Sequence, residues 1–253
     1  MTRVLLLDIG NTRIKWAIAQ GRRRSRQQAL LHGSDWRVAT RGSLARAIAS
    51  ADACRCVSVA AQGLTRALLT LLRRRGLAVK VLRSQRTQLG LINAYREPWR
   101  LGADRWAAML GARASALGRM ALLVVSAGTA LTADLVDREG RHRGGVIVPG
   151  PRLMTASLLA DTAGIARRAR GPRSAGKVRK VFAADTRAAL QAGTGLAAAA
   201  LIEKLRVEAR RELGHDPIVV LTGGDAATLA RQLTCNTKLL PDLVLRGLAA
   251  ALL

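Results

Sequence analysis

Four residues near the N-terminus combine groups that bind phosphate: Asp8, Gly10, Thr12 and Lys15. They follow an apolar run at residues 4–7, which predicts a buried strand that ends at a tight turn. Gly10 lets backbone N–H groups approach an anion, Thr12 adds a hydroxyl, and Lys15 adds a positive charge. Asp8, at the strand end, offers the oxygen ligands that a divalent cation prefers. The stretch indicates a phosphate-binding hairpin, although a turn with a purely structural role fits it equally well.

The same design recurs at residues 122–137, where an apolar strand, a Gly-Thr turn and a second strand follow one another. Ser126 occupies the position that corresponds to Asp8. An internal repeat of this kind predicts two related half-domains, each with its own sheet and crossover helices. We therefore predict halves at residues 1–118 and 119–253, with the ligand in the cleft between them.

The elements that must position these hairpins follow from hydrophobic periodicity. In the first half we expect a third strand at 28–32, a helix at 43–51, a strand at 54–60, a helix at 64–74 and a strand at 77–82. Three strands followed by alternating helices and strands are typical of a ribonuclease-H-like half. The second half is expected to contain a strand at 145–148, helices at 151–160 and 186–213, a basic loop at 166–180 and a strand at 218–221.

A further carboxylate of interest is Asp104, in a helix predicted to open within residues 101–106 and to run to residue 117. A carboxylate in the first turn is favoured by the helix dipole and often only caps the helix. Two features favour a role beyond capping. Gly102 suits a connection that lines a cleft, and Tyr95, the only tyrosine, lies nine residues upstream. Both roles fit the local sequence.

The thiols and imidazoles show no metal-ligand spacing. Cys54 and Cys56 alternate along a predicted strand and Cys235 stands alone, so we expect free thiols in a reducing cytoplasm. His142, between two arginines, is expected to be a loop or strand-end residue rather than a catalyst, and the other two histidines have no nearby metal-ligand partners.

The composition is that of a globular protein with a large positive charge. An apolar fraction of 49% over 253 residues permits a substantial core, and the first apolar stretch is too short for a secretory segment or a membrane span. The net charge of +26 suggests nucleic-acid binding, but aromatic residues make up only 2% of the chain and no helix-turn-helix, RNA-binding-sheet or zinc-finger pattern is present. We expect non-specific binding of polyanions at low salt, and neither a specific nucleic-acid partner nor a membrane partner.

The motifs together resemble one family, the type III pantothenate kinases, whose relatives include the Bvg accessory factor proteins. The matching motifs occur in the family's order over nearly the whole chain. They are Asp8-Ile9-Gly10-Asn11-Thr12-Arg13-Ile14-Lys15, Tyr95 with Pro98, Gly102-Ala103-Asp104-Arg105, Ala127-Gly128-Thr129-Ala130, Gly144-Gly145 through Pro149-Gly150, Asp185-Thr186, Thr222-Gly223-Gly224 and Leu245-x-Gly247-Leu248.

This resemblance implies an α/β fold of the actin-like, sugar-kinase-like ATPase type, made of two ribonuclease-H-like halves and usually found as a homodimer. It also implies phosphorylation of pantothenate by ATP to 4'-phosphopantothenate, the first step of coenzyme A biosynthesis. By the same resemblance, the stretch from Asp8 to Lys15 and Thr129 bind the nucleotide, with Asp8 near magnesium. The resemblance makes Asp104 the base, and it assigns the pantothenate pocket to Tyr95, Gly102, Ala103, Asp104, Arg105 and Thr186.

Ser126 departs from the family pattern, which usually has an aspartate there that is linked to an activating monovalent cation, potassium or ammonium. A neutral hydroxyl is a much weaker partner for a cation in a partly buried site. Two hypotheses follow. Either Ser126 and backbone carbonyls hold the cation weakly, or the active site is impaired and the chain is a noncatalytic accessory or regulatory paralogue on the same fold.

Overall fold

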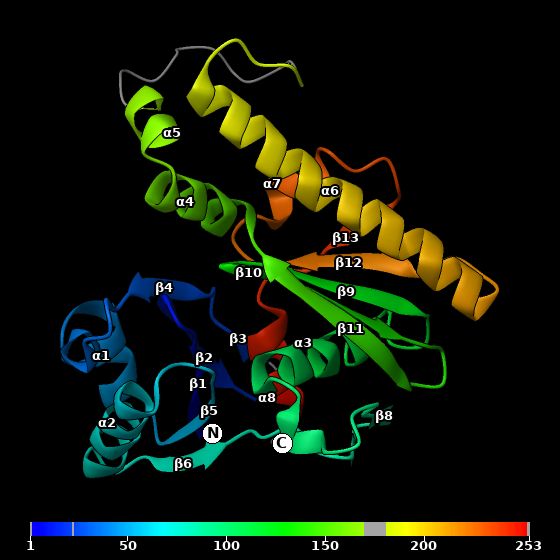
Figure 1. Ribbon diagram of the computed structural model, residues 1–253. Coiled ribbons are helices and arrows are strands. Elements are labelled where there is room, and N and C mark those ends of the chain that lie inside the picture. Colours follow the sequence, from blue (N-terminus) through cyan, green and yellow to red (C-terminus); the bar gives the residue numbers. More distant parts are fainter. Residues whose placement is uncertain (1, 22, 170–180, 252–253) are drawn as a thin grey trace. The chain divides into compact units, whose positions relative to one another are not determined.

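The computed structural model (Figure 1) describes residues 2–21, 23–169 and 181–251. By internal contacts the chain forms two compact units. Unit 1 comprises Met1–Met120, Val136–Gly144 and Asp242–Leu253, and unit 2 comprises Ala121–Leu135 and Gly145–Pro241. The predicted halves, 1–118 and 119–253, rest on the sequence repeat rather than on contacts, and that division stays a prediction.

Unit 1 is built on a mixed six-stranded sheet. In it β1 (Arg3–Ile9) pairs antiparallel with β2 (Arg13–Gln20), which also pairs with β3 (Arg23–Arg24) and β4 (Gln28–Leu31). On its other edge β1 pairs parallel with β5 (Ala53–Ser58), which in turn pairs with β6 (Ala78–Val81). The predicted N-terminal hairpin is therefore present, with Asp8 directly opposite Lys15.

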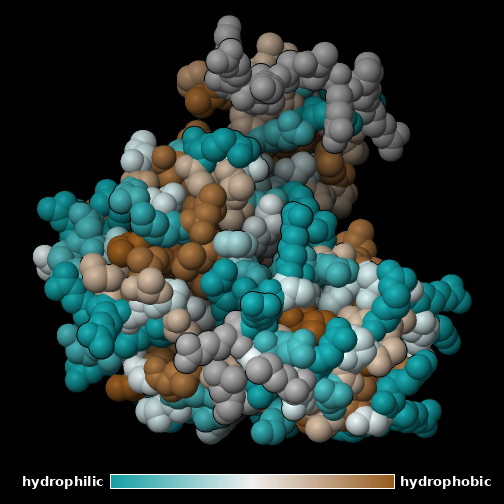
Figure 2. All heavy atoms as spheres, turned by 180° about the vertical axis from the view of Figure 1, so that it is seen from behind, coloured by the Kyte–Doolittle hydropathy of each residue, from teal (hydrophilic) through white to brown (hydrophobic). Residues whose placement is uncertain are grey.

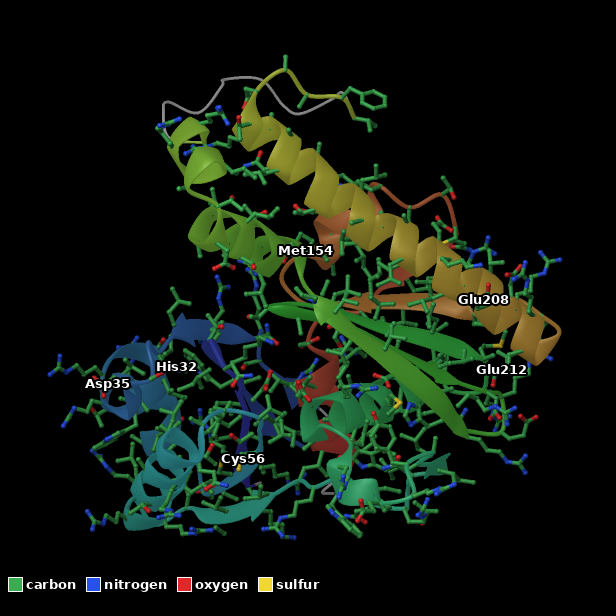
Figure 3. All side chains as sticks on the ribbon, viewed as in Figure 1. His32, Asp35, Cys56, Met154, Glu208 and Glu212 are labelled. Atoms are coloured by element: carbon green, nitrogen blue, oxygen red, sulfur yellow. The ribbon has the colours of Figure 1, made fainter. Side chains whose placement is uncertain are left out.

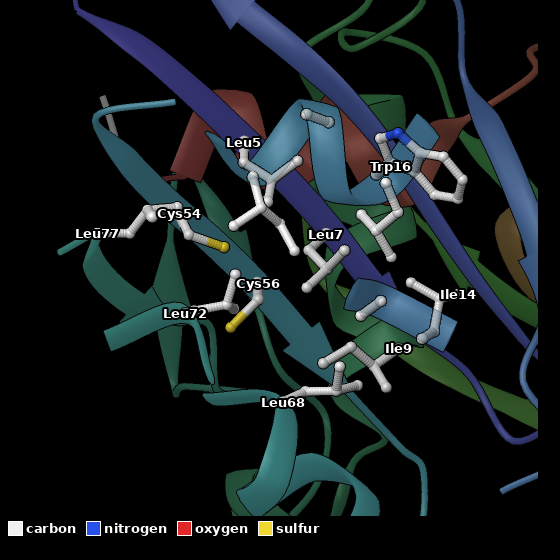
Figure 4. Close-up of a cluster of buried hydrophobic side chains, with 14 of the residues drawn as sticks. Leu5, Leu7, Ile9, Ile14, Trp16, Cys54, Cys56, Leu68, Leu72 and Leu77 are labelled. Atoms are coloured by element: carbon white, nitrogen blue, oxygen red, sulfur yellow. The ribbon is translucent and has the colours of Figure 1, made fainter. Parts of the chain in front are cut away.

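Helices cover both faces of this sheet. On one face α1 (Gly42–Ala49) and α2 (Gln62–Arg74) pack on β1, and the shared core (Figure 4) includes Leu5, Leu7, Ile9, Leu44, Ile48, Leu64, Leu68 and Leu72. On the other face α3 (Ala103–Arg113) packs against β5, and α8 (Leu243–Ala251) packs against β1 and β5. Because side chains alternate along a strand, Asp8 lies on the face of β1 opposite that core, toward α3 and α8.

The crossing of α3 and α8 fixes α3 on the sheet. It requires glycine on each helix, because a Cβ at Gly111 would overlap the carbonyl oxygen of Leu243 and one at Gly247 would overlap that of Ala107. The carboxylate of Asp242, just before α8, lies 2.7 Å from the guanidinium of Arg24 on β3. The C-terminal helix thus holds the helix that carries Asp104.

Four short elements complete unit 1: the 3-10 helices η1 (Trp36–Thr40) and η2 (Pro98–Arg100), and a small hairpin of β7 (Thr87–Gln88) and β8 (Leu91–Ile92). The hairpin and η2 flank the loop of Tyr95. The sequence analysis predicted neither the hairpin nor η2, because elements of two or three residues are too short to show a hydrophobic periodicity.

Unit 2 is built on a five-stranded sheet in the order β11-β10-β9-β12-β13. Its strands are β9 (Leu122–Ala127), β10 (Ala130–Val136), β11 (His142–Pro149), β12 (Ile218–Thr222) and β13 (Thr237–Leu239), and its helices are α4 (Pro151–Asp161), α5 (Ala163–Arg168), α6 (Thr186–Leu213) and α7 (Ala226–Ala230). The long helix α6 buries Ala198, Ile202 and Ala209 against one face of this sheet. Its start is capped by Asp185, whose Oδ1 accepts a hydrogen bond from Ala188 N at 2.8 Å.

Two expectations about elements are corrected. The helix expected to reach residue 117 ends at Arg113, and beyond it the Ser115 hydroxyl donates to Ala112 O at 2.6 Å and accepts from Leu117 N. Such local side-chain bonds compete with helical ones. The predicted basic loop at 166–180 begins inside α5, which continues to Arg168, while residues 170–180 lie outside the described residues.

The surface is mixed in character. On the face drawn in Figure 2, hydrophilic and hydrophobic residues are interspersed. Exposed ion pairs occur near the end of α6, where Glu208, labelled in Figure 3, pairs with Lys204 and Arg211 at 2.5 and 2.8 Å. No helix among the described residues has both the length and the apolar character needed to cross a membrane.

Candidate active site

The first hairpin places a buried carboxylate beside an ammonium. Asp8, near the carboxyl end of β1, is only 4% exposed, and its Oδ2 lies 3.2 Å from Lys15 Nζ on β2. The hydrogen bond from Gly10 N to Arg13 O, at 3.0 Å, closes the turn between them. A buried carboxylate requires such compensation. The hairpin therefore combines a positive charge, a negative charge and an exposed turn within one short stretch.

His32 supports this turn, and the sequence analysis missed that role. The side chain of His32, labelled in Figure 3, is 3% exposed. Its Nε2 lies 2.9 Å from Gly10 O, while Nδ1 accepts a hydrogen bond from Ser34 N at 2.9 Å. Because Nδ1 is an acceptor, Nε2 carries the hydrogen and donates it to Gly10. His32 follows β4 directly, but no local pattern connects a histidine there to a glycine 22 residues earlier.

Asp104 lies in the first turn of α3 but is not its N-cap residue, and its side chain satisfies one of the first-turn N–H groups. The N-cap residue is Gly102, which has no side chain to form a capping hydrogen bond. Asp104 Oδ1 accepts a hydrogen bond from the backbone N–H of its neighbour Arg105 at 2.8 Å. A Cβ at Gly102 would approach Asp104 Oδ1 to 2.8 Å. The absence of a side chain at Gly102 thus leaves room for the carboxylate.

The surroundings of Asp104 raise the pKa of its carboxyl group. Burial raises the pKa of the Asp104 carboxyl above its ordinary value, and the negative charge of Asp8 raises this pKa further, against lowering by the Arg105 N–H and guanidinium. Asp8 and Asp104 are therefore close enough to interact through charge. Perturbed carboxyl groups of this kind cluster at functional sites.

Next to Asp104, three side chains form a layered group. Arg105 is 5% exposed, and its Nη1 donates to the Tyr95 hydroxyl at 3.2 Å, with its guanidinium carbon 6.0 Å from the centre of the Tyr95 ring. His142, at the start of β11 and 3% exposed, stacks on Tyr95 with the ring centres 6.1 Å apart and the planes 15° apart. The structure therefore brings together Asp8, Lys15, Asp104, Arg105 and Tyr95 of the predicted site residues, and it adds His142.

Three predicted site residues, Thr129, Thr186 and Ser126, lie in unit 2. Thr129 is in the turn between β9 and β10, and its carbonyl oxygen accepts from Gly150 N at 2.8 Å. Thr186 is the first residue of α6, directly after the capping residue Asp185. The turn between β9 and β10 is closed by a glycine, as the turn of the first hairpin is, since Gly128 N donates to Ala130 O at 3.0 Å.

Ser126 lies in a group of oxygen-bearing side chains on one face of the second sheet. On β9, β10 and β12 the apolar residues facing α6 alternate with Ser126, Thr132, Asp134 and Thr222, so these four residues share the opposite face. Ser126 and Thr222 are direct neighbours on paired strands. Within the described part of the chain, the buried Thr132 Oγ1 makes no hydrogen bond.

The donor sets determine which ions the residues suit. No group of three or more histidine, cysteine or acidic side chains that suits a metal ion occurs among the described residues. Asp8 nevertheless suits Mg²⁺ that arrives with a nucleotide, because such ions take one or two carboxylates and complete their coordination with phosphates and water. The hydroxyls near Ser126 suit a monovalent cation, but Ser126 supplies no charge of its own.

Sequence comparisons agree with the motif pattern. The sequence model of the type III pantothenate kinase family matches residues 4–208. A type III pantothenate kinase of Azoarcus sp. (strain BH72) is 37% identical over 252 residues, which cover 97% of this chain and 89% of the relative. One of Stenotrophomonas maltophilia (strain K279a) is 38% identical over 244 residues, covering 96% and 95%.

Comparisons with solved structures concern the fold. A Campylobacter jejuni protein described as a Baf family transcriptional activator superposes with a TM-score of 0.56 at 20% identity, covering 97% of this chain and 95% of the other. The ethanolamine utilization protein EutJ of Carboxydothermus hydrogenoformans gives 0.54 at 13% identity, covering 100% and 90%. These similarities confirm the predicted α/β fold of the actin-like, sugar-kinase-like type.

Proposed function

The chain belongs to the type III pantothenate kinase family and phosphorylates pantothenate with ATP, the first step of coenzyme A biosynthesis; on this premise we propose that Asp104 is its catalytic base. The observation that carries the proposal is the position of the Asp104 carboxylate, which lies in the first turn of α3, next to the buried Arg105, and interacts through charge with Asp8 of the Asp8–Lys15 pair. The hydroxyl of pantothenate is the acceptor, and Asp104 takes its proton as the oxygen attacks the γ-phosphorus of ATP; the bond from this phosphorus to the β,γ-bridging oxygen breaks, and ADP leaves.

The chemistry suits a carboxylate with a raised pKa. Phosphoryl transfer passes through a loose transition state, so orienting the acceptor oxygen and neutralising the phosphates contribute most of the catalysis. A general base contributes roughly 10²–10⁴-fold, and most when its pKa approaches the working pH. Burial and the charge of Asp8 shift the pKa of Asp104 in that direction.

We assign nucleotide binding to the first hairpin, residues 8–15, together with Thr129. Lys15 Nζ and the backbone N–H groups of the Gly10 turn bind phosphate oxygens, and the bond from His32 to Gly10 O keeps the turn in place. Asp8 is the carboxylate for Mg²⁺, which when bound neutralises charge on the phosphates. Because Lys15 lies beside Asp8, we expect its ammonium and the Mg²⁺ held by Asp8 to neutralise charge on the same phosphate group.

We assign the pantothenate pocket to Tyr95, Gly102, Ala103, Asp104, Arg105 and Thr186. Within unit 1 these residues are supported by the Arg105–Tyr95 hydrogen bond and by the space that Gly102 leaves next to Asp104. Arg105 is buried and always charged, and it suits an anionic or strongly polar group of the acceptor.

For the monovalent cation we propose weak binding by neutral oxygens. Ser126, Thr132 and Thr222 supply hydroxyls on one face of the second sheet, and the buried Thr132 Oγ1 makes no hydrogen bond among the described residues. Without a carboxylate at position 126, we expect a high requirement for potassium or ammonium, or none.

We also propose a homodimer, which is supported by the surface of unit 2. The helix α4 buries none of its side chains, and Leu153, Leu158 and Leu159 are 42%, 39% and 37% exposed. Exposed leucines on a helix that buries none of its side chains are typical of an interaction surface. Light scattering on the purified protein measures the mass, and a monomer of 26.9 kDa at all concentrations would contradict the proposal.

We place the reaction in the cytoplasm. The three cysteines are free thiols: Cys54 and Cys56 are buried in the core of unit 1, and Cys235 is partly exposed in unit 2. Free thiols are the ordinary state in a reducing compartment.

The assay that tests the proposal is ATP-dependent phosphorylation of pantothenate with magnesium, with and without potassium or ammonium. We expect product from the parent protein and a fall in kcat of about 10²–10⁴-fold in Asp104→Asn. ATP binding should survive in that variant, because Asp104 contacts the acceptor rather than the nucleotide. Unchanged turnover in Asp104→Asn would remove Asp104 from the mechanism. No product from the parent, with ATP still bound, would favour the noncatalytic alternative.

A further inference from the structure

The loop that carries Tyr95 is fixed along its backbone. Asn93 Oδ1 accepts from Tyr95 N at 3.0 Å, and Asn93 itself is buried. Arg86 donates to the carbonyl oxygens of Tyr95 and Arg96 at 2.8 and 2.6 Å. These bonds set the position of the Tyr95 backbone. They leave the direction of its side chain to other contacts.

Two contacts set that direction. Arg105 Nη1 donates to the Tyr95 hydroxyl at 3.2 Å, which fixes the tip of the side chain. His142 stacks on the ring with nearly parallel planes, 15° apart, which fixes its tilt. A phenol held at its tip by one hydrogen bond can still rotate about that point, so a flat partner on the ring is needed to define one orientation.

The position of His142 is itself well fixed. Ile92 N donates to Gly140 O at 2.9 Å, and Asp137 Oδ1 accepts from Arg141 N at 2.7 Å. His142 is 3% exposed, so its ring has little freedom to move away from Tyr95. The segment before β11 thus serves as a rigid support for the Tyr95 ring.

We infer that His142 is a positioning residue for the acceptor pocket, whose imidazole ring holds Tyr95 in the orientation that meets Arg105 and the substrate. This inference rests on the proposed function, because it takes Tyr95 as part of the pantothenate pocket. His142 acts through Tyr95 and does not touch the reacting atoms. Its loss should therefore weaken pantothenate binding more than it slows the chemical step.

The kinetic test compares His142→Ala, His142→Leu and His142→Phe. The alanine and leucine variants lose the stacking contact with Tyr95. From the usual strength of such contacts we expect the KM for pantothenate to rise about 2- to 10-fold in both variants, with the KM for ATP unchanged. The leucine variant keeps the volume without a flat ring. His142→Phe should restore the KM for pantothenate to within about twofold of the parent. Failure of phenylalanine to rescue would overturn the inference.

A double-mutant cycle tests whether the effect passes through Tyr95. In a Tyr95→Ala background, His142→Leu should no longer change the KM for pantothenate, because the ring it positions is absent. An equal effect in both backgrounds would assign His142 a role independent of Tyr95. The matched control is His32→Ala, a second buried histidine, which we expect to raise the KM for ATP instead.

A spectroscopic test needs no activity. Tyr95 is the only tyrosine, so fluorotyrosine incorporated into the full chain gives a single site-specific fluorine NMR signal. We expect this signal to shift and sharpen in His142→Leu, to return toward the parent value in His142→Phe, and to stay unchanged in His32→Ala. An unchanged signal in His142→Leu would refute the stacking. If instead the signal responds but the parent protein does not phosphorylate pantothenate, the proposed function fails and His142 orients Tyr95 without a kinase pocket.

Discussion

The hairpins β1–β2 and β9–β10 share one plan but carry different chemistry. In both, an apolar strand leads to a turn whose glycine N–H bonds back across the hairpin, to Arg13 O in the first and to Ala130 O in the second. The first contains a buried carboxylate paired with an ammonium at 3.2 Å, whereas the second has the hydroxyl of Ser126 at the corresponding position. The shared parts make the hairpin. The ion pair at the strand end is an addition that the hairpin does not require, and it is absent at the corresponding position of the second hairpin, whose buried carboxylate, Asp134, lies on the return strand instead.

The same contrast extends to the surroundings of each hairpin. Around the first, Asp104 and Arg105 add further charges, and burial raises the pKa of Asp104. Around the second, Thr132 and Thr222 add hydroxyls. Keeping partly buried charges costs stability, and such groups cluster at functional sites. Around the first hairpin Asp8, Asp104 and Arg105 are all buried or partly buried, whereas on the face of Ser126 the buried charge is the single carboxylate of Asp134.

The largest expected difference between the hairpins concerns ATP. Lys15→Met removes a charged donor, and charge-assisted hydrogen bonds are worth about 1.5–3 kcal/mol, so we expect the KM for ATP to rise roughly 10- to 100-fold. The matched change in the second hairpin, Thr129→Val, removes a neutral donor and should raise this KM only about 2- to 10-fold. Steady-state kinetics at saturating pantothenate measure both. Equal effects would show that the two hairpins bind the nucleotide alike.

A second difference concerns stability and its dependence on pH. The pKa of Asp104 is raised in the folded state, so its ionised form at neutral pH destabilises the fold. We therefore expect Asp104→Asn to raise Tm at pH 7 by roughly 1–4 °C. The gain should shrink as pH falls through the folded pKa and vanish near the unfolded value of about 4, where both states bind the proton.

The control for this prediction is Ser126→Ala, which removes a neutral group from the second hairpin. Its effect on Tm should be the same at every pH between 5 and 8, because no titrating group is lost. Thermal unfolding followed by circular dichroism measures both variants. A destabilised Asp104→Asn at pH 7 would mean that the carboxylate stabilises the folded state, which contradicts the direction of its pKa shift.

Local signals in the sequence were enough to predict the elements that carry the site. The helix α6 has the predicted bounds because Asp185 caps its start and Gly214, with φ of 76°, ends it, and both residues are readable signals. Both hairpins were predicted from apolar runs that stop at Gly-containing turns. The helix α3 ended early because Ser115 bonds locally, which hydrophobic periodicity does not register.

What the sequence did not reveal are contacts between distant segments. His32 reaches Gly10, and His142 reaches Tyr95, across 22 and 47 positions. Neither histidine is itself part of a motif that the sequence analysis identified. The close crossing of α3 and α8 likewise depends on Gly111 and Gly247, each of which lies against the backbone of the other helix. The sequence of either helix alone does not predict this contact. Such supports arise from tertiary packing, so a single sequence contains no pattern that identifies them.

The smallest expected effect follows from making the hairpins more alike. Ser126→Asp places a carboxylate opposite Thr222, on a face that already carries the hydroxyl of Thr132 and the carboxylate of Asp134. If neutral oxygens now hold the cation weakly, the added charge should lower the potassium concentration for half-maximal rate about 10-fold, with kcat changed less than about 3-fold. Potassium should then also raise the Tm of the variant more than that of the parent, since a ligand that binds only the folded state stabilises it.

A variant that responds to potassium as the parent does, in both rate and Tm, would show that position 126 does not contribute to a cation site. The hydroxyl in the second hairpin would then reflect tolerance of the fold rather than an altered cation requirement.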